Sequence, residues 1–152
     1  MKLRRRQQAG IAMIEMVAVT PLLLLLMLGI SEIGKAFMQY NTLNKSVREA
    51  VREVSRTALL GTTGIMSLTP ELIAEGKNLV VYGNVAGTGQ PRLPELTASH
   101  VSVTSAGNNL VLIQANYPYT PIFGPLLTSF GYGNEISVSG ITLTASVVMR
   151  AL

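Results

Sequence analysis

Apolar residues are concentrated near the start of the chain, in residues 11–30. Within this stretch Glu15 is the one charged residue and Thr20 the one polar residue, and residues 22–28 are an unbroken run of leucine and methionine. Twenty helical residues rise about 30 Å, which matches the hydrocarbon core of a bilayer. The pattern therefore predicts a transmembrane helix.

An amphipathic pattern follows and extends the predicted helix to residue 60. Its stripe recurs at alternating spacings of four and three, with one polar interruption: Ile33, Phe37, Tyr40, Asn44, Val47, Val51, Val54 and Ala58. Such a stripe needs a surface to pack on. We expect that surface to be the chain's own C-terminal domain, and a partner helix in a bundle is the alternative. Arg48, Glu49, Arg52, Glu53 and Arg56 lie largely off the stripe and are expected to form a solvated face with i,i+3 pairs.

The middle of the chain alternates between helix signals and turn signals. Residues 61–64, Gly-Thr-Thr-Gly, can end the long helix. Thr69 and Pro70 are typical of a helix start, and Gly76 is expected to end that short helix. Residues 79–82 then predict a strand, and residues 83–97, rich in glycine and proline, predict a loop.

The C-terminal half has the alternation typical of strands. Residues 100–104 and 110–117 are expected to pair as a hairpin across residues 106–109. Residues 118–133 should be an irregular excursion, and residues 136–149 a long strand with a bulge at Gly140. The predicted fold is α+β and consists of a long N-terminal helix, membrane-spanning below and amphipathic above, packed on a small antiparallel sheet of three or four strands.

Composition excludes several function classes. Hydrophobic residues make up 48% and charged residues 13%, which argues against disorder. The chain has no cysteine, no aspartate and one histidine, so a two-histidine metal site and Ser-His-Asp catalysis are excluded. Four of the 12 basic residues lie in residues 2–6, and the remaining 8 equal the 8 acids. Nucleic-acid binding, which needs a basic face or stripe, is therefore not expected.

No catalytic, metal or cofactor site is expected either. His100 stands beside Ser99 with Glu95 upstream, but no nucleophile elbow surrounds any serine. His100 is more simply an exposed polar residue in a strand. Five aromatic residues gather around the proline- and glycine-rich excursion, where they either form an adhesive surface or, as we favour, cap the end of the sheet: Tyr117, Tyr119, Phe123, Phe130 and Tyr132.

Glu15 needs an explanation, because a carboxylate near the middle of a membrane helix costs about 2.5–3.5 kcal/mol. One interpretation places Glu15 at the cytoplasmic edge, within reach of water or of Arg5 and Arg6. The other is that the chain is cut between Gly10 and Ile11. The new Ile11 amine would be largely cationic at neutral pH. Glu15 would then pair with such an amine, which in a stack of subunits could belong to a neighbour.

Pro21 lies inside the apolar run. Proline lacks a backbone donor and crowds the carbonyl four residues earlier, here that of Val17. We expect a kink or local unwinding there, with Thr20 or neighbouring helices satisfying the freed group.

The flanking charges predict the orientation of this helix. Basic residues precede it, whereas Glu32 and Lys35 cancel just after it, so the N-terminus should be cytoplasmic and the rest outside. A cleaved secretory signal is a competing interpretation. Its apolar core is usually about 7–15 residues long, however, and no convincing small-residue cleavage pattern follows here.

Residues 4–60 resemble the TadE-like minor pseudopilins of the Tad (Flp) pilus, which are type IV pilin-like proteins. The shared features are a basic leader ending in Gly10, Glu15 at the fifth position after it, Pro21 inside the apolar run, and an exit at residues 29–32, Gly-Ile-Ser-Glu. Residues 44–53 are similar to that family's asparagine- and arginine-rich helix. Met16 stands where major Flp pilins have tyrosine, and the chain is longer than those pilins. Both departures favour a minor pseudopilin.

The resemblance implies a pilin-like fold and a processing step. A prepilin peptidase would cut between Gly10 and Ile11 on the cytoplasmic side. Residues 1–10 would be the leader, 11–30 the transmembrane helix, 31–60 its amphipathic extension, and 61–152 an extracytoplasmic domain. The implied partners are that peptidase, other pilin and pseudopilin subunits, the pilus assembly machinery and inner-membrane lipid.

The function expected from the resemblance is structural. The chain would sit in the bacterial inner membrane or in a pilus used for cell adhesion, with Glu15 setting the register between helices. The alternative is an uncleaved single-pass membrane protein with an extracytoplasmic binding domain, in which Gly10 and Glu15 have no special role.

Overall fold

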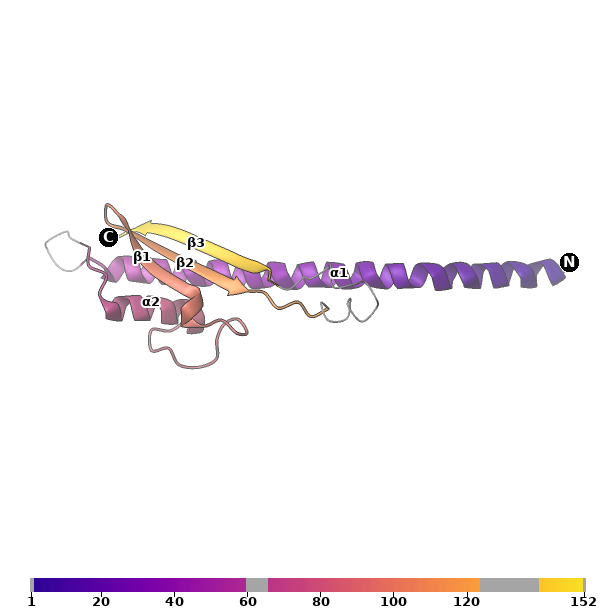
Figure 1. The fold of residues 1–152 in the computed structure, drawn as a ribbon, viewed down its shortest axis with the longest axis horizontal. Helices are drawn as coiled ribbons and strands as arrows, with labels where there is room; N and C mark the ends of the chain where they lie inside the picture. The colour runs from indigo at the N-terminus through magenta and orange to yellow at the C-terminus, as the bar shows by residue number, and fades with distance from the viewer. Residues whose placement is uncertain (1, 60–65, 124–139, 152) are drawn as a thin grey trace.

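One helix dominates the computed structural model, which describes residues 2–59, 66–123 and 140–151 and, in the first helix, side chains at residue 10 and from residue 12 onward. Helix α1 is Lys2–Thr57, and its 56 residues rise about 84 Å. All other elements lie beside its C-terminal end, so the N-terminal part extends alone (Figure 1). The helix ends at Thr57 rather than at residue 60, and the Gly-rich stop at 61–64 lies outside the described residues.

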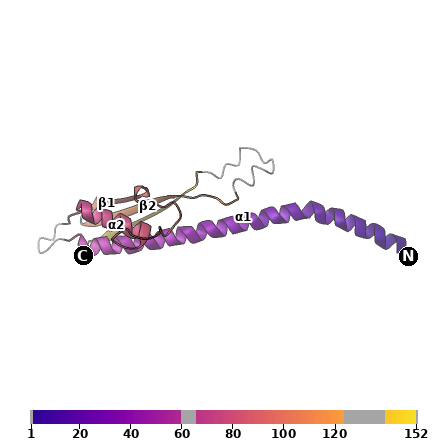
Figure 2. The same cartoon turned by 90° about the horizontal axis from the view of Figure 1, so that it is seen from below.

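Helix α1 bends in its N-terminal part, the part that contains Pro21 (Figure 2). The predicted kink therefore agrees with the shape of the helix. Of the two donors expected for the freed carbonyl, Thr20 is not the one, which leaves neighbouring helices. The Thr20 hydroxyl donates to the carbonyl of Met16 at 2.6 Å, not to that of Val17, which Pro21 deprives of its donor.

The second helix, α2, is Pro70–Tyr82 and folds back beside the upper part of α1 (Figure 1). Its start is confirmed, because the Thr69 hydroxyl accepts the N–H of Leu72 at 3.2 Å. The expected end at Gly76 and the expected strand over residues 79–82 are wrong. Gly76 is buried against Val54, where a Cβ would come within 2.9 Å of a methyl group. Tertiary packing therefore explains this glycine. The helix ends instead at Tyr82, and Gly83, which has φ +80°, caps it.

The sheet has three antiparallel strands in the order β1-β2-β3: Val101–Gly107, Leu110–Pro118 and Thr142–Arg150. The predicted hairpin is confirmed, and Gly107, Asn108 and Asn109 all have positive φ. The bulge predicted at Gly140 is not found. Gly140 precedes β3, which pairs with β2 without a shift, and the register shift lies in β1 instead, between Ser105 and Gly107. Residues 136–139 of the predicted long strand lie outside the described residues.

The core forms between the sheet, α2 and the upper part of α1. Helix α1 and the residue just after it bury side chains on one face from position 43 onward: Leu43, Val47, Ala50, Val51, Val54 and Ala58. Packing on the chain's own domain is therefore confirmed for the upper stripe. It is wrong for the lower stripe, since Ile33 and Phe37 are 71% and 65% exposed. Ala36 does pack against the core, so the face of α1 that the domain covers at this level is not the predicted stripe.

The fold class is confirmed as α+β with a small antiparallel sheet on a long helix, and the absence of helix or strand over residues 83–97 agrees with the predicted loop. Tyr117 and Tyr119 are buried at the end of β2 and just beyond it, as expected of residues that cap the sheet. Phe130 and Tyr132 of the same aromatic group lie outside the described residues.

Candidate functional site

The lower half of α1 contains the apolar run and extends away from the described helices and strands of the outer domain (Figure 1). Its large apolar side chains are exposed on every side of the helix, and Met13 and Ile14, for example, are each 74% exposed. This is the one described helix that is long and apolar enough to cross a membrane. Apolar surface of this extent needs lipid or other helices to cover it.

Gly10 lies within α1, and its conformation is helical. A Cβ at this position would meet no described heavy atom within 4 Å, in contrast to Gly76 in the core. Nothing in the described fold therefore requires glycine here. In a helix interior glycine costs about 1 kcal/mol relative to alanine, so residue 10 is a weak point of the helix.

Glu15 is exposed on the same helix, five positions further along. It has no hydrogen bond or ion pair to any side chain that the structure describes. A carboxylate within a segment this apolar gains a partner only from outside the described part of the chain. Gly10, Glu15 and Pro21 thus share the unpartnered part of α1, far from the outer domain (Figure 1).

The chain segment after β2 is tied to α1 just beyond the apolar run. The Tyr119 hydroxyl donates to the Glu32 carboxylate, and the N–H of Ile122 lies 3.2 Å from each carboxylate oxygen. Lys35 Nζ donates to the carbonyl of Thr120 at 3.1 Å. These five residues, which we name the Glu32 clasp, join the outer domain to α1 near the end of the expected membrane span.

The pKa shifts in the clasp follow from this geometry. Burial raises the pKa of Glu32, but the Tyr119 hydrogen bond, the N–H groups of Ile122 and Phe123 and the charge of Lys35 lower it by more. The net pKa lies below the ordinary value. Burial and the hydrogen bond to Glu32 hold the pKa of Tyr119 above its ordinary value. The clasp therefore favours an ionised Glu32 and a neutral Tyr119.

We expect the clasp to make stability depend on acid pH. Because the folded pKa of Glu32 lies below its ordinary value of 4.5, its contribution is present above about pH 4.5 and is lost as the pH falls through the folded pKa. Thermal unfolding of the detergent-solubilised chain between pH 6 and pH 3 measures this loss. Glu32→Gln should lower stability at pH 6 and flatten the pH dependence, whereas Glu71→Gln on α2 should not. Equal slopes for wild type and Glu32→Gln would contradict the assignment.

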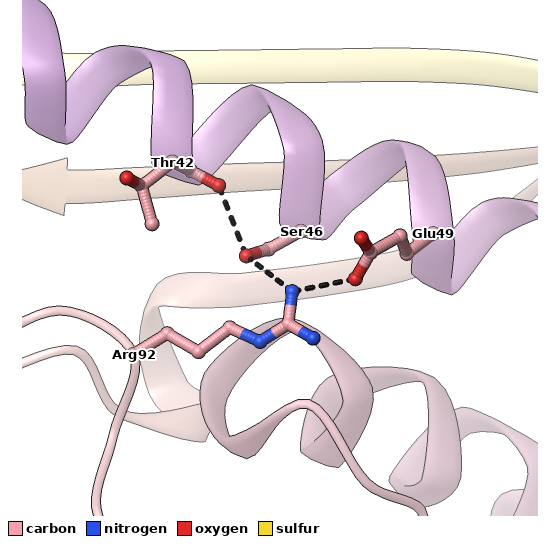
Figure 3. Close-up of polar contacts among 4 residues, drawn as sticks. All are labelled: Thr42, Ser46, Glu49 and Arg92. Atoms are coloured by element: carbon pink, nitrogen blue, oxygen red, sulfur yellow. Dashed lines mark hydrogen bonds and ion pairs between the residues drawn. The ribbon is translucent and has the colours of Figure 1, made fainter.

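A second polar contact ties the loop after α2 to α1. The Arg92 guanidinium lies 2.6 Å from the Glu49 carboxylate and donates to the Ser46 hydroxyl at 3.1 Å (Figure 3). Ser46 in turn donates to the carbonyl of Thr42 at 3.0 Å. Glu49 is therefore not part of a purely solvated face, as the sequence suggested. Arg56 and Glu53 do form the expected i,i+3 pair, at 3.9 Å.

The residues considered for hydrolase chemistry have structural contacts instead. His100 ends a 3-10 turn, Ala98–His100, so its expected place in a strand is wrong. Its Nδ1 accepts the N–H of Thr97 at 3.3 Å, and the Ser99 hydroxyl bonds to the Thr97 hydroxyl at 2.7 Å. Glu95 accepts a hydrogen bond from Thr120 at 3.2 Å. Among the described residues, no three His or Glu side chains gather as metal ligands do.

Comparison with known families gives a match within the long helix α1. Residues 10–52 match the family model described as TadE-like protein. This part of the chain is similar to TadE-like proteins. The match begins at Gly10 and ends at Arg52 in α1, so it contains Glu15, Pro21 and Glu32. No curated protein and no solved structure matched the chain.

The match supports a general role for the chain. TadE-like proteins are associated with the Tad pilus and are structural rather than catalytic, and the matched helix supports such a role here. Pilus subunits and assembly machinery are the partners that the family implies. The apolar lower half of α1, which the match includes, agrees with association with a membrane.

The Glu32 clasp and the Arg92 contact were not predicted from the sequence. Their partners are 85–90 residues apart for the clasp and 43–46 residues apart for Arg92. No local spacing signals such pairs. Glu32 itself was noted only as part of the helix exit and as a charge that Lys35 cancels.

Proposed function

We propose that this chain is a TadE-like minor pseudopilin, which a prepilin peptidase cuts after Gly10 and which assembles into a Tad pilus through α1. The observation that supports this proposal most is the lower half of α1, whose apolar side chains are exposed all round. In the membrane, lipid would cover them. In the pilus, sister helices would do so.

The leader, residues 1–10, would remain on the cytoplasmic side with its four basic residues. Residues 11–30 would cross the inner membrane, residues 31–60 would continue above it, and the domain of residues 61–152 would be periplasmic. Gly10 fits a cut at this place in two ways. It makes the helix easier to unwind locally, and it offers no side chain to obstruct access to the bond after it.

Glu15 would set the register between subunits after the cut. The amine of Ile11 and the carboxylate of Glu15 are four helical residues apart, a rise of about 6 Å. A neighbouring subunit shifted outward along the axis by about this distance brings its Ile11 amine level with Glu15. In an apolar environment an ion pair of this kind favours one arrangement over others.

The N-terminal mass of the protein, extracted from membranes with and without the cognate prepilin peptidase, tests the proposal. We expect a peptidase-dependent N-terminus at Ile11. An intact leader in both samples would instead support an uncleaved single-pass membrane protein with an extracytoplasmic binding domain.

A further inference from the structure

The outer face of α1, which points away from the core, carries an unpaired cationic stripe. Arg48 and Arg52 are exposed one helical turn apart, and Lys45 precedes them on the same side. Neither arginine takes part in an ion pair among the described residues, whose pairs join Arg56 to Glu53 and Arg92 to Glu49. A groove beside this stripe is lined by residues of α1 alone, Tyr40, Asn41, Asn44, Lys45, Arg48 and Glu49.

Helix α2 carries an acidic stripe of the same length. Glu71 and Glu75 are exposed one helical turn apart, with the small exposed residue Ala74 between them. Leu72, Gly76 and Val80 face the core, so the acidic stripe is on the opposite side of α2. Neither glutamate takes part in an ion pair within the described residues. The domain thus presents two arginines and two glutamates, each pair with i,i+4 spacing, on two different helices.

We propose that these stripes bind each other between two copies of this chain, with Arg48 and Arg52 of one copy against Glu75 and Glu71 of the next. Helix α2 runs antiparallel to α1 (Figure 1). Copies that share one orientation in the membrane therefore present α2 antiparallel to a neighbour's α1. In that arrangement Arg52 lies opposite Glu71 and Arg48 opposite Glu75, and both spacings are one turn, about 6 Å.

The contact requires an axial shift between the copies, and the size of this shift follows from the fold. Within one chain Gly76 of α2 lies against Val54 of α1, so Glu75 is about level with residue 55. To meet Arg48, the copy that supplies α2 must be displaced by about seven residues of helix, roughly 10 Å toward the cytoplasm. The two stripes lie on different elements, so each copy can use both at once. Such a contact is head-to-tail and adds further copies without closing.

The direction of this shift agrees with that of the Glu15 contact, and this agreement rests on the proposed function. In both contacts the copy nearer the cytoplasm supplies the carboxylates, and the copy further out supplies the cations. The shifts are about 6 Å and about 10 Å, and side-chain reach can cover the difference. One neighbour can therefore make both contacts.

Anionic lipid is a poor alternative occupant for the cationic stripe. Arg48 lies 18 residues beyond Ile30, which places it about 27 Å along the helix from the end of the expected span. The field of a charged membrane surface decays within a Debye length, about 8 Å at physiological ionic strength. A protein surface of opposite charge is within reach at that height, and the acidic stripe of α2 is such a surface.

Site-specific photocrosslinking of the full chain in membranes tests the contact. A benzophenone amino acid at position Ala74 should crosslink to a second copy, and the attached peptide should fall within residues 41–56 of α1. The same probe at Ser146, which is exposed on β3, is the matched control and should not attach there. Because the readout concerns the outer domain, it can succeed or fail whether or not the chain is cut after Gly10.

Charge inversion then tests whether the stripes hold the contact. Arg48→Glu with Arg52→Glu, or Glu71→Arg with Glu75→Arg, gives four charges of one sign and should lower the crosslink yield about tenfold. Mixing the two variants, with the probe in the Glu71→Arg/Glu75→Arg chain, should restore the crosslink, because that chain's α2 then faces an α1 of opposite charge. This mixture also shows that both variants are folded.

Three results would overturn the proposal. The first is an Ala74 probe that attaches only to another protein, and the second is a probe that yields no crosslink to the same chain. The third is a crosslink whose yield is unchanged by inversion or not restored in the mixture.

Discussion

Replacing Gly10 with leucine should leave the chain uncut in cells that contain the prepilin peptidase. A leucine side chain would obstruct access to the bond after residue 10 and would favour the helix that must unwind there. A combined penalty of about 3 kcal/mol on the transition state corresponds to roughly a hundredfold slower cleavage. The N-terminal mass of the membrane-extracted protein, followed over time after induction, measures the effect.

Gly29→Leu is the matched control for this experiment. Gly29 lies in the same helix, and a Cβ there would also meet no described atom within 4 Å. We expect this variant to be cut at the wild-type rate. Normal cutting of Gly10→Leu would contradict the assigned cleavage site, and slow cutting of both variants would indicate a general defect in membrane insertion.

Replacing Glu15 with glutamine should impair assembly of the chain into pili without impairing its insertion into the membrane. Insertion should be unchanged or improved, because a neutral amide costs less than a carboxylate in an apolar span. Incorporation into pili should fall by at least about a hundredfold, since breaking a buried ion pair costs about 3–5 kcal/mol. The ratio of the variant in sheared pili to that in membranes measures both effects at once.

Glu32→Gln is the matched control for Glu15→Gln, since it makes the same chemical change beyond the apolar run. It weakens the Glu32 clasp within one chain but leaves the span unchanged, so its incorporation should stay close to wild type. A normal pilus-to-membrane ratio for Glu15→Gln would contradict a role for Glu15 in register. A fall in both membrane and pilus fractions would place the defect in insertion instead.

Local sequence patterns were enough to predict the helices and strands that are determined by short-range interactions. The apolar run of residues 11–30 and the amphipathic stripe predicted one long helix, and the Thr69 cap predicted the start of α2. The Gly107–Asn109 turn predicted the β1–β2 hairpin, because its residues tolerate positive φ. Each of these signals depends on a few neighbouring residues, so it can be recognised in the sequence without knowledge of the tertiary structure.

Predictions failed where packing between distant segments overrides local preference. Gly76 looked like a helix stop, but in the structure it allows α2 to pack closely on Val54 of α1. Residues 79–82 have strand-forming side chains, yet Val80 and Val81 are buried in a helix that continues to Tyr82. Propensity differences of about 1 kcal/mol or less are easily outweighed by burying such side chains.

The sequence by itself determined the membrane-like helix, the α+β class and the resemblance that the family comparison confirmed, because these depend on composition and short-range spacing. It also singled out Gly10, Glu15 and Pro21, whose proposed roles require nothing from the rest of the fold. Only the tertiary structure decided how far the sheet covers α1, and therefore which part of its stripe remains exposed. Only the structure paired Glu32 with Tyr119 and Arg92 with Glu49, and left Arg48, Arg52, Glu71 and Glu75 on outward faces. These contacts join residues tens of positions apart, and such pairings are set by how the segments pack in space rather than by any local pattern.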